Sequence, residues 1–215
     1  MYYLLQSNYL YLMPIETLEQ HYLVPEHLQG IQKDLSHTVT LESGEDADDW
    51  FVEAMERLLK INDWNKLNNN LNLLLSLCDH HGKNVSRRAH RGDYIKILPK
   101  GSSPVSDNAP HWVRVEAIEY DDYPDTDRES IAIHLQPSIG PFYRNGHNAD
   151  LDNTDASGTF VIERWGKRLN TSYHSRNDVS ETTATIQNSE LIAAIISWFS
   201  VEDKQWESLL KAFVE

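Results

Sequence analysis

TFVIERWGKRLNTSYHSRND, residues 159–178, carries the clearest structural pattern in this sequence. Two runs of alternating apolar and polar residues flank Trp165-Gly166-Lys167, where the glycine supplies the positive φ that a tight turn needs. The pattern predicts a β-hairpin with one packed face. That face contains Phe160, Ile162, Leu169, Thr171 and Tyr173.

The opposite face of this hairpin is the first candidate site. Its second arm aligns Arg168, Asn170, Ser172, His174 and Arg176, and its first arm adds Val161 and Glu163. Three interpretations of this row stay open: a solvated sheet face, a docking surface and a catalytic surface. Arginine and asparagine beside aromatic rings are typical of docking surfaces. The row has no evident nucleophile, so catalysis would need Glu163 and His174 to act as an acid–base pair.

Three further segments show the same two-residue period. They are residues 92–99, 111–120 and 130–137. Together with the hairpin they predict about five antiparallel strands with one wet face, forming a curled sheet or a small barrel.

The segments before the sheet show helical spacing. Residues 46–62 place Phe51, Met55, Leu58 and Leu59 on one face, with Asp46 as the expected N-cap. Residues 63–82 place an apolar stripe opposite an asparagine-rich face and end at Gly82, a suitable C′ residue. The stripe contains Leu67, Leu71, Leu74, Leu75 and Cys78. The two segments predict an antiparallel helical hairpin.

Two helices are expected after the sheet. Residues 187–199 carry Leu191, Ile192, Ile195 and Phe199 on one stripe. Ser200 and Asp203 resemble a capping box for a last helix, whose apolar face holds Trp206, Leu209, Leu210 and Phe213. The fold class expected is therefore α+β. The expected regions are a mainly helical 1–84, an antiparallel β region 85–178 and a C-terminal helical pair 179–215, packed as one compact unit.

The composition restricts the class of protein. The chain has 215 residues, 40% of them hydrophobic and 24% charged, which is typical of a globular protein. The net charge is −14, yet residues 85–120 and 156–178 are mildly basic. We therefore expect an acidic body carrying a mildly basic sheet. This charge disfavours nonspecific binding to DNA or anionic membranes and favours a basic partner.

The expected compartment is the cytoplasm. Cys78 is the only cysteine, so no internal disulfide forms, as is usual in a reducing compartment. The apolar start of the chain lacks the basic region of a secretory signal, because Lys33 is the first basic residue. The longest apolar run, residues 191–199, is far too short to span a membrane.

A second candidate site lies in DHHGKNVSRRAHRGD, residues 79–93. Asp79, His80, His81 and His90 carry carboxylate and imidazole groups that bind Zn²⁺ or Mn²⁺. Their spacing matches no metal motif such as H-E-x-x-H, and histidines near a helix C-terminus also interact well with the helix dipole. A metal-dependent hydrolase using His80, His81 and His90 stays open as an alternative.

The function expected from these features is non-enzymatic. The chain has no G-x-S-x-G elbow and no glycine-rich phosphate loop, and we expect no cofactor and no catalytic residue. We expect an acidic protein-binding protein, of the inhibitor, immunity or adaptor type, that docks a macromolecular partner. A nucleic-acid-binding β-domain is the other alternative. It would use Arg87, Arg88, Arg114, Arg168 and Arg176.

Overall fold

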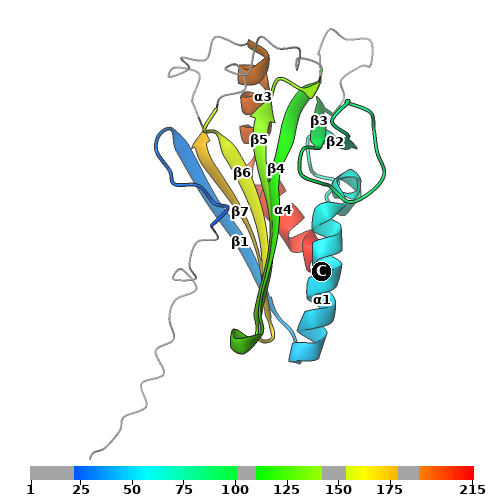
Figure 1. The fold of residues 1–215 in the computed structure, drawn as a ribbon, viewed down its shortest axis with the longest axis vertical. Coiled ribbons are helices and arrows are strands. Elements are labelled where there is room, and N and C mark those ends of the chain that lie inside the picture. The colour runs from blue at the N-terminus through cyan, green and yellow to red at the C-terminus, as the bar shows by residue number, and fades with distance from the viewer. Residues whose placement is uncertain (1–21, 101–109, 142–153, 179–188) are drawn as a thin grey trace, which may run out of the picture.

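The computed structural model describes residues 22–100, 110–141, 154–178 and 189–215, and its centre is one antiparallel sheet (Figure 1). The sheet has seven strands in the order β1-β7-β6-β5-β4-β3-β2. The strands are β1 (Ile31–Thr40), β2 (Leu73–Cys78), β3 (Tyr94–Pro99), β4 (His111–Tyr123), β5 (Arg128–Ser138), β6 (Ser157–Trp165) and β7 (Arg168–Asp178).

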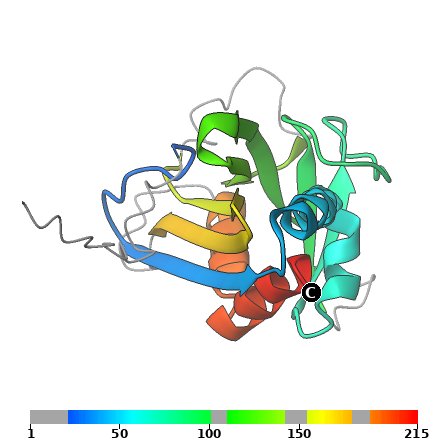
Figure 2. The ribbon, with the colours of Figure 1, turned by 90° about the horizontal axis from the view of Figure 1, so that it is seen from below.

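The sheet is open and curved. β1 and β2 form its two edges, so the strands do not close into a barrel. Of the two architectures expected from the sequence, a curled sheet and a small barrel, the structure has the curled sheet. Figure 2 shows the sheet curving around the helices, which lie on its concave side. We call the opposite side of the sheet the far face.

The described part of the chain contains four α-helices and two short 3₁₀ turns. They are α1 (Gly44–Leu59), η2 (Ile61–Asp63), α2 (Trp64–Leu67), η3 (Pro124–Thr126), α3 (Ser189–Phe199) and α4 (Asp203–Phe213). α3 and α4 confirm the two predicted C-terminal helices, and α4 buries the four apolar residues expected of it, but the predicted Ser200 cap is wrong, because the N-cap of α4 is Glu202 and makes no side-chain capping bond. α1 also buries its predicted stripe, but its N-cap is Ser43, whose Oγ accepts a hydrogen bond from the Asp46 amide. None of these helices is long and apolar enough to cross a membrane.

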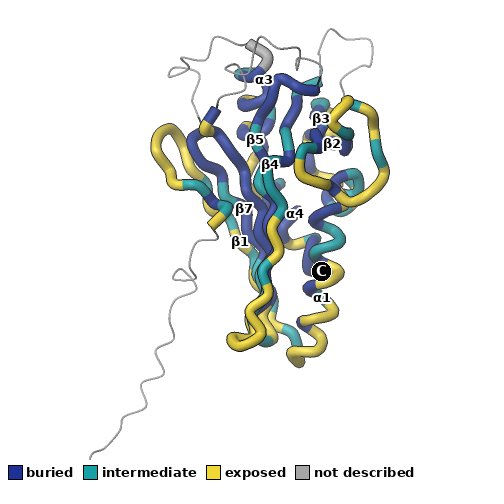
Figure 3. Tube along the Cα trace, in the orientation of Figure 1, coloured by how far each residue is buried: buried dark blue, intermediate teal, exposed yellow. Residues whose placement is uncertain are grey.

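Aromatic rings fill the space between the sheet and the helices. Phe160 of β6 lies at their centre, with its ring centroid 4.9 Å from that of Trp64 and 5.4 Å from that of Trp206. The Trp198 indole N–H donates to the Tyr173 hydroxyl at 3.1 Å, which joins α3 to β7. The core therefore ties α2, α3 and α4 to the middle of the sheet (Figure 3).

The predicted helix over residues 63–82 is wrong. It consists of one helical turn, α2, followed by the edge strand β2. Leu73, Leu75 and Leu77 are buried while Leu74 is 43% exposed, so the run follows a two-residue period. A short apolar run fits both periods, and pairing with β3 selects the strand here. Of the asparagines predicted on a solvated helix face, Asn65 instead bonds to this strand, and Asn68 donates to the Gln205 carbonyl of α4.

β1 is the other strand that the sequence prediction missed. Its residues alternate between half-buried and exposed, and it pairs antiparallel with β7 along its length. β1 and β2 raise the strand number from about five to seven. Both fall within residues 1–84, so that range supplies the two edges of the sheet as well as α1 and α2. Residues 1–21 and 179–188 lie outside the described residues.

Candidate functional site

The hairpin register places the predicted polar row on the far face. Glu163 pairs with Asn170, Val161 with Ser172, and Trp165 with Arg168, while Tyr173 faces the core. The row therefore runs along β6 and β7 on the side of the sheet away from the helices. The predicted pairing of Phe160 and Ile162 with the core-facing residues of β7 is confirmed.

The upper part of the row is a closed hydrogen-bond network. His174 Nδ1 lies 2.6 Å from Asp34 Oδ1 on β1, and His174 Nε2 lies 3.0 Å from Ser172 Oγ. Arg176 donates to the same Asp34 oxygen at 2.7 Å. Ser172 and Arg176 are each only 5% exposed. These two residues therefore present little surface to a partner.

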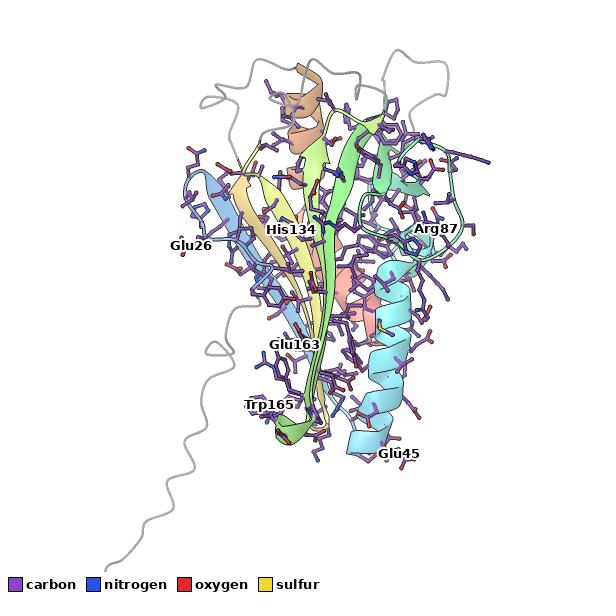
Figure 4. All side chains as sticks on the ribbon, viewed as in Figure 1. Glu26, Glu45, Arg87, His134, Glu163 and Trp165 are labelled. Atoms are coloured by element: carbon purple, nitrogen blue, oxygen red, sulfur yellow. The ribbon has the colours of Figure 1, made fainter. Side chains whose placement is uncertain are left out.

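Residues 22–30 cover this part of the far face. Leu23 and Val24 pack on Ala132 and Val161, and the Leu23 carbonyl accepts a hydrogen bond from Thr159 Oγ1. Thr159 also lies 2.9 Å from His134 Nδ1, which adds a second half-buried histidine beneath the segment. Figure 4 shows His134 above Glu163 on the sheet.

The connection Ser172–His174–Asp34 has the order of a nucleophile, a base and an orienting carboxylate. Asp34 can only accept, so His174 Nδ1 carries the proton and Nε2 accepts from the Ser172 hydroxyl. Burial lowers the pKa of His174 despite the nearby carboxylate. Burial alone would raise the pKa of Asp34, but hydrogen bonds from Arg176 and His174 outweigh it and lower that pKa.

This arrangement serves the structure better than it serves catalysis. Ser172 is buried, and Asp34 divides its charge between His174 and Arg176. β7 is paired with β1 on one side and with β6 on the other, so its backbone amides form the sheet rather than an oxyanion hole. The network attaches the edge strand β1 to β7.

The lower part of the row is accessible. The acid–base pair of Glu163 with His174 does not form, because Glu163 accepts from Arg128 at 2.8 Å. Asn170 accepts from Thr38 of β1 at 3.0 Å. Arg168 is exposed and has no ion pair within the described ranges. It lies directly across from Trp165, which is 55% exposed, so these two side chains end the row in solvent.

The second candidate site forms an exposed loop after β2. Asp79 accepts from the backbone amides of His81 and Lys83, and the rings of His80 and His81 are tilted by 45° with centroids 3.8 Å apart. The exposed His90 donates its backbone N–H to Asp93 Oδ2. Across the part of the chain that the structure describes, no three His, Cys, Asp or Glu side chains come close enough to hold a metal.

Most arginines of the alternative nucleic-acid surface are paired with carboxylates. Arg87 binds both oxygens of the buried Asp93, and Arg88 binds Glu56 of α1. Arg114 pairs with Glu116, and Arg176 pairs with Asp34. Of the five arginines, Arg168 alone lacks an ion pair to a described residue. Internal pairing thus neutralises the surface on which phosphate binding would depend.

Sequence reasoning missed several residues that the fold brings to the site. Asp34 and Arg128 come from strands that are far from the hairpin in sequence, and no local pattern marks them. The exposure of Trp165 could have been predicted from the sequence, because a large aromatic residue at a tight turn lies beyond the packed part of the hairpin. Arg164, on the other face, is buried among carboxylates of three segments.

Comparisons with known proteins identify no family. No family model matches the sequence, and no curated protein matches it. A hypothetical protein from Helicobacter pylori has a TM-score of 0.45 at 12% identity, with 85% of this chain and 86% of that chain covered.

Two further solved structures also match over most of their length. The major latex-like protein 151 from Panax ginseng has a TM-score of 0.34 at 10% identity, covering 85% of this chain and 95% of that one. The Zhui aromatase/cyclase from Streptomyces sp. R1128 has a TM-score of 0.35 at 10% identity, covering 86% and 92%.

Proposed function

We propose that this protein acts by binding a basic protein, without catalysing a reaction, in the cytoplasm. This is the manner of an inhibitor, an immunity-type protein or an adaptor. The net charge of −14 and the internal use of the arginines support the proposal. Because most described arginines pair with carboxylates inside the fold, the charge presented to a partner is mainly negative.

The accessible part of the far face supports a docking role. Trp165 is exposed at the end of this face, with Arg168 directly across from it at the border, and tryptophan is enriched at the energetic centres of protein interfaces. The buried Ser172 and Arg176 contribute by fixing β7 rather than by touching a partner.

Affinity purification from the organism that makes the protein tests this function. The bait is the full chain, used at low and at physiological salt, beside an unrelated acidic protein of similar isoelectric point. We expect one basic protein at near-equal amount with this bait alone. The purified pair should bind at micromolar concentration or tighter. If no protein co-purifies with the bait even at low salt, the proposal is contradicted.

A further inference from the structure

Three segments that are distant in sequence meet at one end of the molecule. They are the start of α1, the connection between β4 and β5, and the turn between β6 and β7, at the bottom of Figure 1. The Leu41 amide donates to the Lys167 carbonyl at 2.9 Å, which joins the first of these to the last. We call these three segments, residues 41–53, 119–129 and 164–168, the acidic end.

Arg164 holds the acidic end together. Its guanidinium lies 2.7 Å from Asp48 of α1, 2.8 Å from Asp127 of the connection and 2.6 Å from Glu129 of β5. It also donates to the Gly166 carbonyl at 3.0 Å. Burial alone would lower the pKa of Arg164, but these carboxylates outweigh it and raise that pKa. A buried cation therefore fixes the relative positions of the three segments.

The acidic end carries more carboxylates than its cations can neutralise. Arg164 is occupied by three of them, Arg128 pairs with Glu163, and Lys167 and Arg168 lie on the β7 side of this end. The exposed acidic residues without an ion pair to any described residue are Glu42, Glu45, Asp46, Asp49, Glu119, Asp122 and Asp125. Figure 3 shows this end as one of the most exposed parts of the trace. Such a surface attracts cations and repels anions.

Exposed aromatic rings also lie at the acidic end. Trp165 is 55% exposed, Tyr123 is 47% exposed and Tyr120 is 51% exposed. Tyr123 and Trp165 both flank Arg128 in one row of the far face, and Tyr120 lies on the helix side near Phe51. Tyrosine and tryptophan faces bind ammonium and guanidinium groups, and Trp is the strongest of them.

We infer that the acidic end is the surface that binds a lysine- and arginine-rich segment of the protein partner. This inference rests on the proposed function. The carboxylates of α1 and of the β4–β5 connection pair with the cations of the segment. Tyr123 and Trp165 pack on the aliphatic stems and charged groups of its lysine and arginine side chains. Arg168 lies at the β7 border and repels the segment, so it sets the edge of the contact.

Binding of a labelled peptide tests the inference on the full chain. The probe is a synthetic peptide of alternating arginine, lysine and leucine residues, and its control replaces the cations with glutamates. We expect the basic peptide to bind and the acidic one not to bind. The double variant Trp165→Ala/Tyr123→Ala should weaken binding about tenfold, which is typical of a central aromatic contact.

Charge variants give matched controls. Asp122→Asn/Asp125→Asn should weaken binding and flatten its dependence on salt, whereas Glu26→Gln/Glu207→Gln removes the same charge elsewhere and should not. Arg168→Gln should strengthen binding, because it removes a repulsive cation. The inference is overturned if the wild type, Asp122→Asn/Asp125→Asn, Glu26→Gln/Glu207→Gln and Arg168→Gln all bind the basic peptide with equal affinity. It is also overturned if Arg168→Gln weakens binding. Circular dichroism of each variant confirms that the fold is kept.

The outcome separates this inference from the proposed function. A natural partner that is retained by Trp165→Ala/Tyr123→Ala and by Asp122→Asn/Asp125→Asn leaves the docking function standing and rejects the acidic end as its site. A protein that captures no partner, while its acidic end still binds the peptide, rejects the function alone. Self-association that Asp122→Asn/Asp125→Asn abolishes in sedimentation would identify a second copy as the occupant and overturn the inferred partner.

Discussion

Arg164 is the residue on which the lower end of the molecule depends most. Its side chain is 9% exposed, and it faces Asp48, Asp127 and Glu129, of which Glu129 is itself nearly buried. A buried cation among carboxylates contributes little by its presence, but its removal leaves like charges facing one another.

Arg164→Met should therefore destabilise the protein by about 2 kcal/mol, below the usual range for a buried pair because Asp48 and Asp127 are largely exposed. Urea unfolding measures this as a lower midpoint with an unchanged slope. Lys66→Met is the control, since it breaks the exposed pair with Asp63 and should cost less than about 0.5 kcal/mol. Equal effects of the two variants would contradict the role assigned to Arg164.

Three half-buried histidines should make stability depend on pH. Burial lowers the pKa of His111, His134 and His174 below 6.5, so the folded protein binds fewer protons than the unfolded chain in this range. Their contribution is present above pH 6.5 and is lost as the pH falls through the folded pKa values.

The melting temperature should accordingly fall as the pH is lowered from neutral to about 5, the range in which histidine charges. His134→Gln should flatten this profile, and the exposed His80→Gln should leave it unchanged. Differential scanning calorimetry at a series of pH values provides the measurement. A profile that is identical in His134→Gln and the wild type would contradict the contribution assigned to His134.

At the scale of elements, β2 shows how an edge strand is stabilised by side chains. Asn62 Oδ1 accepts from the Leu77 amide at 2.8 Å, and its Nδ2 donates to the Val85 carbonyl at 2.7 Å. Asn65 bonds to both the amide and the carbonyl of Leu75. The asparagines occupy the backbone groups that an unpaired edge would leave open to other strands.

Asn62→Ala should cost about 2 kcal/mol, because it leaves two backbone groups without partners. Hydrogen exchange should show faster exchange at Leu77 with little change in β6. The matched control is the exposed Asn70→Ala, for which we expect no measurable change. Uniform loss of protection over the whole sheet would argue against a local role for Asn62.

At the scale of the whole molecule, one ring couples the sheet to the helices. Phe160 contacts Trp64 of α2, Trp198 of α3, and both Trp206 and Phe213 of α4. Three helices therefore pack on the same residue at the centre of β6, and the fold should unfold as one unit.

Phe160→Ala should destabilise the protein by about 4 kcal/mol, the usual cost of emptying a buried aromatic site. The near-ultraviolet circular dichroism of the tryptophans should weaken, since Trp64, Trp198 and Trp206 all border the cavity. Phe160→Leu, which fills part of the site, should cost markedly less. Helices that melt separately from the sheet in the wild type would contradict this coupling.

The sequence alone was sufficient for the elements whose pattern is local. Period-two alternation predicted the hairpin of β6 and β7, and helical spacing predicted α1, α3 and α4, whereas the pairing register of the hairpin came from the structure. It also placed Arg168, Asn170, Ser172, His174 and Arg176 on one face, because side chains alternate strictly along a strand.

Long-range contacts settled the rest. Pairing with β3 made β2 a strand, since its leucine run fits a helix equally well by local spacing. Asp34 of β1 and the segment 22–30 enclosed Ser172 and Arg176, while Arg168 stayed in solvent. Asp48, Asp127 and Glu129 met at Arg164 only through folding. Periodicity tells which side of its element a residue faces, but exposure and charge pairing depend on segments that are remote in sequence.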